Sequence, residues 1–171
     1  MQIASALDAN PDDLDDDHER NFVALIREHG WFNTRVFDAD PPFSYTTGFL
    51  LKGSPEFIVF SLPKEIAHDT FWHLFRGASA GVQRKAGVRD DDVLGNHSAY
   101  LFKVAERYHK DHLGWSRWFY GAKHISTLQL VWPDPTGKFP WEPGFDEDFR
   151  NSQPDLSETG WLNDLANARK R

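Results

Sequence analysis

The amino-acid sequence predicts a single α+β domain, in which two or three helices pack on a mixed or mainly antiparallel sheet of about five strands. Three observations lead to this prediction. The chain has 171 residues, which is enough for one hydrophobic core. Some of the short apolar runs follow one another with no predicted helix between them, whereas the strands of an all-parallel sheet alternate with helices. Aromatic residues make up 15% of the chain, which indicates a core of large flat side chains.

The chain divides into three parts. Residues 1–16 are expected to form an acidic flexible leader, with five aspartates between Asp12 and Asp17. They lack the D-x-D-x-D-G order of a calcium loop. Residues 17–156 are expected to form the globular domain, and 157–171 a tail with a short amphipathic segment.

The first half of the domain is predicted to begin with a helix over 17–28, because Phe22 and Ile26 recur at helical spacing. Gly30 then stops it. Strands are expected at 31–37, 43–50 and 57–60, the last as a continuous apolar run. Proline at position 63 opens a second helix. Its predicted inward stripe consists of Ile66, Thr70, Phe71, Leu74 and Phe75.

The second half is predicted to contain a polar loop over 81–97, followed by strands at 100–104 and 125–132. Residues 107–120 between these strands are expected to be helical, with a break near Gly114. The tail is expected to be irregular until a short amphipathic piece around 161–165.

Composition argues against several classes of partner and cofactor. The net charge of −7 has the wrong sign for binding nucleic acid through its phosphates. With no cysteine, the chain can form neither disulfides nor cysteine-ligated metal sites. The N-terminus lacks the pattern of a signal peptide, and no apolar run approaches the ~20 residues of a membrane span. We therefore expect a cytoplasmic protein that binds neither nucleic acid nor a membrane.

Five short motifs occur in order along the chain. They are His29-Gly30-Trp31, Tyr45-Thr46-Thr47-Gly48-Phe49, Pro55-Glu56-Phe57, Leu128 to Trp132 with Asp134, and Gly137 to Trp141. Together they resemble the bacterial family catalogued as domain of unknown function 4262, over roughly residues 18–156. Many members begin with a cysteine pair, whose metal role, if any, cannot carry over to this chain. The resemblance implies a fold but no reaction, substrate or partner.

Histidines offer a weak hypothesis for a metal site. His109, His112 and His124 fall within a short interval, and the first two share one face of the predicted helix. Surface or hydrogen-bonded structural histidines are the more ordinary interpretation. We expect neither a metal nor a cofactor.

Two residues of the motifs are candidates for acid–base catalysis. Glu56 precedes a buried strand, where desolvation would raise its pKa toward that of a general base, with His29 as a partner. Alternatively, Glu56 binds backbone N–H groups or pairs with Arg35, and His29 contacts the last carbonyls of its helix.

Other motif residues could line an aromatic pocket for a small ligand. These ligand-binding candidates are Tyr45, Thr46, Gln129, Trp132 and Trp141. They could equally form the core and a polar network between strands. Gln129 is the one polar side chain in the run from Leu128 to Trp132, so it must have a partner.

We therefore expect a recognition module that binds a protein partner or a small ligand. The aromatic surplus could also form an exposed patch that supports a homodimer. The alternative is a small enzyme that uses Glu56 and His29, or a histidine-bound metal, for acid–base or hydrolytic chemistry.

Overall fold

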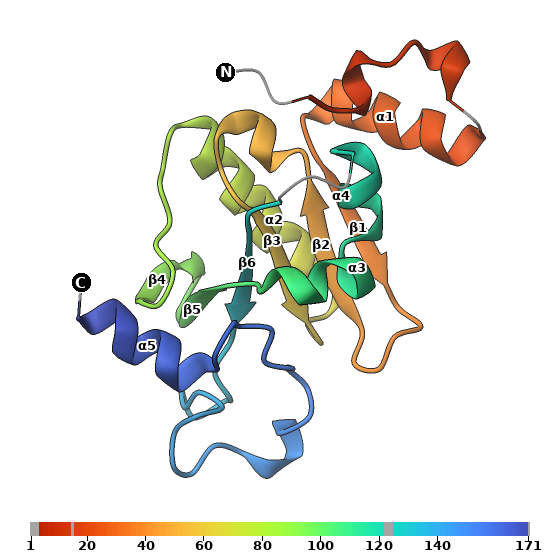
Figure 1. Ribbon diagram of the computed structural model, residues 1–171. Helices are drawn as coiled ribbons and strands as arrows, with labels where there is room; N and C mark the ends of the chain where they lie inside the picture. The colour runs from red at the N-terminus through yellow and green to blue at the C-terminus, as the bar shows by residue number, and fades with distance from the viewer. Residues whose placement is uncertain (1–3, 15, 122–124, 171) are drawn as a thin grey trace.

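One six-stranded sheet forms the centre of the computed structural model, which describes residues 4–14, 16–121 and 125–170. The strand order is β1-β2-β3-β6-β5-β4 (Figure 1). The strands are β1 (Phe32–Val36), β2 (Phe43–Thr47), β3 (Glu56–Phe60), β4 (Arg89–Leu94), β5 (His97–Lys103) and β6 (Thr127–Val131). Strands β3 and β6 run parallel, and the other neighbouring pairs run antiparallel. The α+β class with a mixed sheet is therefore confirmed.

The sixth strand, β4, corrects the prediction of a polar loop over 81–97. Only Val93 of this strand is deeply buried, at 2% exposure, so no apolar alternation marks it in the sequence. β4 lies at one end of the sheet and is interrupted by a register shift between Asp90 and Leu94. Charged residues and irregular pairing are typical of edge strands, because they prevent further strands from adding there.

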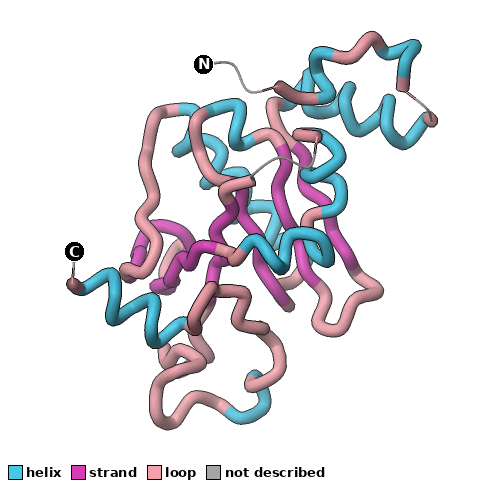
Figure 2. Tube along the Cα trace, viewed as in Figure 1, coloured by secondary structure: helices cyan, strands magenta, loops and turns pink. Residues whose placement is uncertain are grey.

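Helices cover both faces of the sheet (Figures 1 and 2). They are α1 (Asp17–His29), α2 (Lys64–Ser79), α3 (His109–His112), α4 (Gly114–Phe119) and α5 (Trp161–Arg169). This is more than the two or three predicted. The expected helix over 107–120 splits into a 3₁₀ turn at 106–108, α3 and α4, with the break at Leu113. The short amphipathic segment predicted around 161–165 forms the first part of helix α5, which continues to Arg169.

Helix α2 packs on one face of the sheet through residues three and four positions apart. Ala67, Phe71 and Leu74 contact the face that carries Phe57 and Leu101. The prediction that Ile66 faces inward is wrong, because 50% of it is exposed. Ala67 faces inward instead. Because neighbouring residues in a helix are rotated by about 100°, Ile66 points away from the sheet.

The second face of the sheet is covered by several segments. The α3–α4 region covers β2 and β3 through Leu113, which packs with Phe43 and Ile58. Helix α5 and the proline-rich segment cover β5 and β6, where Trp161 packs with Phe102. Trp141 belongs to this layer and stacks on Phe139, with ring centroids 5.3 Å apart. The aromatic residues Phe139 and Trp141 of the last motif are therefore part of the core packing.

Two glycines of the family motifs permit close packing at the end of β2. Gly48 has φ of +117°, and a Cβ there would lie 2.5 Å from the carbonyl oxygen of Gly30 and 2.8 Å from Cα of Trp31. A Cβ on Gly30 would in turn lie 2.6 Å from Cζ of Phe75. Any larger residue would push these segments apart. No helix in the described part of the chain is long and apolar enough to cross a bilayer.

Gly48→Ala is expected to lower the free energy of unfolding by about 3 kcal/mol, because it combines backbone strain with a clash against backbone atoms. Gly95→Ala is the matched control. Gly95 also has a positive φ, of +62°, but nothing lies within 4 Å of its added Cβ, so we expect a loss of about 1 kcal/mol. Urea denaturation measures both, and equal losses would show that the close packing at Gly48 contributes nothing.

Candidate functional site

The side chain of Glu56 is a buried carboxylate at a point where several of the sequence motifs contact one another. Glu56 begins β3 and is 0% exposed. Its Oε1 accepts hydrogen bonds from the backbone N–H of Gly48 (2.8 Å), the N–H of Leu50 (3.2 Å) and the hydroxyl of Tyr120 (2.7 Å). Its Oε2 accepts one from the hydroxyl of Thr46 (2.6 Å). We call these four donor residues and Glu56 the Glu56 cage.

Local folding places each member of the Glu56 cage. Strands β2 and β3 pair antiparallel, so the end of β2 lies beside the start of β3. The N–H of Phe57 donates to Oγ1 of Thr46 at 2.9 Å, which directs the threonine hydroxyl to the carboxylate. Gly48 turns the chain after β2, and its N–H also reaches the hydroxyl oxygen of Tyr120 at 2.9 Å. The cage therefore joins β2, β3 and the end of α4.

Burial dominates the electrostatics of the cage. Desolvation raises the pKa of Glu56 to about 7, although the hydrogen bonds from Thr46, Tyr120, Leu50 and Gly48 oppose the shift. Desolvation and the adjacent carboxylate also raise the pKa of Tyr120. Glu56 belongs to none of the ion pairs found among the described residues.

The two structural alternatives for Glu56 have different outcomes. Its bonds to backbone N–H groups agree with the first alternative. The proposed pairing with Arg35 is wrong, because that guanidinium donates instead to Oγ of Ser44 and the carbonyl of Leu62, both at 3.2 Å.

His29 is not part of the cage. Its side chain is 48% exposed, and its Nε2 lies 3.7 Å from a carboxylate oxygen of Glu28. No hydrogen bond between His29 and Glu56 is present in the described part of the chain. The structure therefore does not assemble the predicted acid–base pair.

The other polar candidates anchor segments to the sheet. The hydroxyl of Tyr45 accepts from the N–H of Trp115 at 2.9 Å. Gln129 donates to the carbonyl of Pro154 at 2.6 Å and accepts from the N–H of Leu156 at 3.2 Å. The partner that Gln129 requires is thus the backbone of residues 154 and 156 of the same protein. Trp132 likewise donates from Nε1 to a main-chain carbonyl, that of residue 60, at 2.8 Å.

The histidine candidates are separate side chains in the core and at its margin. His109 is buried, at 6% exposure. Nδ1 of His112 lies 2.9 Å from the carbonyl of Tyr108. His124 lies outside the described residues. Within the described ranges, no group of three or more His, Asp or Glu side chains could hold a metal ion.

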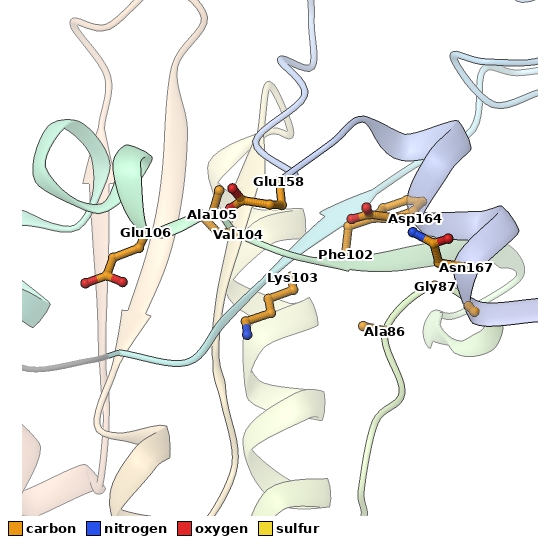
Figure 3. Close-up of a pocket in the computed structure, with 11 residues that line it drawn as sticks. Ala86, Gly87, Phe102, Lys103, Val104, Ala105, Glu106, Glu158, Asp164 and Asn167 are labelled. Atoms are coloured by element: carbon orange, nitrogen blue, oxygen red, sulfur yellow. The ribbon is translucent and has the colours of Figure 1, made fainter. Parts of the chain in front are cut away.

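A cleft of about 350 Å³ opens elsewhere, beside β5 (Figure 3). Residues 102–105 form its floor, Ala86 and Gly87 form one wall, and α5 forms the other. A Cβ on Gly87 would lie 2.7 Å from Cβ of Ala168, so the two walls touch at one end. Sequence reasoning missed this cleft, because it assigned the 81–97 segment to a loop and most of the tail to irregular coil.

The cleft exposes the backbone edge of β5. The N–H of Gly87 donates to the carbonyl of Leu101 at 2.8 Å, so residue 101 directs its backbone groups away from β6. The N–H of Val104 donates to Thr127 at 2.9 Å, so residue 104 faces β6. Because direction alternates along a strand, Lys103 directs its N–H and C=O to the cleft side. No described residue forms a hydrogen bond with either group.

Charged side chains lie on both sides of this edge. Figure 3 shows Asp164 and Asn167 projecting from α5 on one side of β5, and Lys103 projecting on the other side. Glu158 also lines the cleft, and its Oε1 lies 2.9 Å from Nη1 of Arg107. Glu106 points away from the other acidic side chains (Figure 3).

Comparison with known proteins gives a match to a family. Residues 25–146 match the model of a family described as a domain of unknown function, DUF4262. The comparisons with curated proteins and with solved structures found no match. The matched region contains the whole Glu56 cage and the six strands, and it ends before α5.

The raised pKa of Glu56 predicts a pH-dependent stability. Between pH 4.5 and about 7, the folded state holds a proton on Glu56 that the unfolded state has lost. The free energy of unfolding therefore falls as pH rises through this window, by about 3 kcal/mol, and levels off above it. Glu56→Gln removes the ionisation and should remove this fall. Denaturation of both proteins from pH 4.5 to 8 measures the difference, and parallel profiles would contradict the assignment.

Proposed function

This chain belongs to the DUF4262 family, whose description assigns no activity, and we propose from its geometry that it is a recognition module. It binds an extended peptide segment of a protein partner in the cleft beside β5. The observation that carries the proposal is the free backbone edge at Lys103, where one N–H and one C=O face the cleft.

Backbone pairing explains why a peptide suits this edge. In an antiparallel sheet, two opposed residues exchange two hydrogen bonds when their backbone groups face each other. A peptide residue opposite Lys103 can accept from its N–H and donate to its C=O. Many recognition domains bind partners by adding a strand in this way. The chain's own Gly87 already pairs with Leu101, so the bound segment would occupy the next position along the edge.

The walls of the cleft support the same proposal. Its floor is the backbone of β5, because the side chains of Phe102 and Val104 are turned into the core and are only 1% and 2% exposed. Ala86 and Ala168 add small apolar groups to its walls. The volume of about 350 Å³ falls within the range of sites for small ligands, so it suits a short segment rather than a folded domain.

An acid–base enzyme is supported less well by the same structure. A catalytic acid or base must lie within hydrogen-bond reach of its substrate. Glu56 and Thr46 are both 0% exposed, and Tyr120 is 3% exposed. His29 is near Glu28 at the end of α1 rather than in the cage. The Glu56 cage therefore supports a structural role.

The variant Lys103→Pro tests the proposal because it removes the outward N–H. Proline is tolerated at an edge position whose N–H makes no ladder bond. We expect an equimolar pool of acetylated, amidated random pentapeptides to shift the ¹H–¹⁵N signals of Gly87, Lys103 and Val104 in the unmodified protein. In K103P, the shifts of Gly87 and Val104 should disappear.

Lys103→Ala is the matched control, since it keeps the N–H and removes only the side chain. It should retain binding within about fivefold, the range of one exposed ion pair. Circular dichroism checks that both variants are folded. Peptide binding that leaves the cleft signals unmoved, or that persists unchanged in a folded K103P, would refute the proposal.

A further inference from the structure

The two sides of β5 carry opposite charges at the cleft, and we infer that the bound segment carries a basic residue directly next to an acidic residue. This inference rests on the proposed function, since it specifies the sequence of the peptide that would pair with the edge. It follows from the placement of two side chains, Asp164 and Lys103.

The acidic side of the cleft is formed by α5. Asp164 lines the cleft from this helix (Figure 3), and its Oδ1 accepts a hydrogen bond from the hydroxyl of Thr159 at 3.1 Å. Its Oδ2 forms no hydrogen bond or ion pair with any described residue. Glu158, the neighbouring acid, already pairs with Arg107. Asp164 is therefore the carboxylate on this side that can pair with a ligand cation.

The basic side of the cleft carries Lys103. Ala99 and Leu101 of the same strand contact the α2 side of the sheet, and side chains alternate along a strand, so Lys103 points to that side. Phe102 points to the opposite side, where it packs with Trp161 of α5. Lys103 is exposed and takes part in no ion pair within the described ranges.

A peptide added to this edge has the same alternation. Its neighbouring side chains point to opposite faces of the sheet, about 3.3 Å apart along the chain. A lysine or arginine that faces α5 meets Asp164, and the adjacent glutamate or aspartate then faces Lys103. Two charges separated by one residue would instead lie on the same face, where only one of them meets a complementary partner.

Two peptides of identical composition test this pattern. In Ac-Ala-Lys-Glu-Ala-Ala-NH₂ the charges are adjacent, and in Ac-Ala-Lys-Ala-Glu-Ala-NH₂ they are separated by one residue. We expect the first peptide to bind about threefold more tightly, as one additional exposed ion pair provides. Titrations followed by the ¹H–¹⁵N signals of Gly87 and Val104 give both dissociation constants.

Variants on the protein provide the controls. Asp164→Asn should remove the preference, whereas Asp69→Asn, which changes an acid on α2, should leave it intact. Lys103→Glu should prefer the peptide Ac-Ala-Lys-Lys-Ala-Ala-NH₂ over the adjacent-charge peptide, which a merely structural role of Lys103 does not predict.

The outcomes separate the inference from the proposed function. Equal affinities for the two isomeric peptides, with shifts at the cleft, would overturn the charge pattern and leave peptide binding in place. If neither these peptides nor the random pool shifts the cleft signals, both the inference and the proposed function are wrong.

Discussion

The burial of one carboxylate, that of Glu56, constrains the rest of this structure. A carboxylate that loses its water must be supplied with hydrogen-bond donors, and here they come from the end of β2, the turn after it and the end of α4. Each donor is available only if its segment lies at the correct place. Gly48 must turn with a positive φ directly against Gly30 and Trp31, and Gly30 must let Phe75 of α2 approach. One buried acid thus fixes the mutual positions of β2, β3, α2 and α4.

This dependence explains what the family motifs encode. Thr46, Gly48 and Glu56 contribute directly to the cage, and Gln129 and Trp132 hold other segments to the sheet. These residues contact other parts of the same protein, and the proposed recognition uses other groups. In the cleft beside β5, the backbone N–H and C=O of Lys103 have no partner among the described residues. One of its walls, α5, lies beyond the region that matches the family model.

Much of the fold could be predicted from local patterns. Apolar runs and helical spacing indicated α1, α2 and five of the strands. Most of these elements bury apolar side chains, although β1 is only partly buried along its whole length. Strand β4 was not predicted, because apart from Val93 its residues are polar, charged or only partly buried. The sequence indicated that Gln129 needs a partner but could not name it, since Pro154 and Leu156 are distant along the chain. For the same reason, the sequence named Glu56 as a candidate but could not show that Tyr120 reaches it or that His29 does not. The cleft has no sequence signature, because its decisive groups are the backbone N–H and C=O of Lys103.

The edge of β5 is open at Lys103, while the neighbouring backbone is paired. Amide hydrogen exchange, resolved by residue in the free protein, tests this most directly. The N–H of Val104 is bonded to Thr127, so it should exchange slowly, whereas that of Lys103 should exchange at least about a hundredfold faster. If both amides exchange at the same slow rate, the edge of β5 is already paired at Lys103 and is not free to bind a peptide.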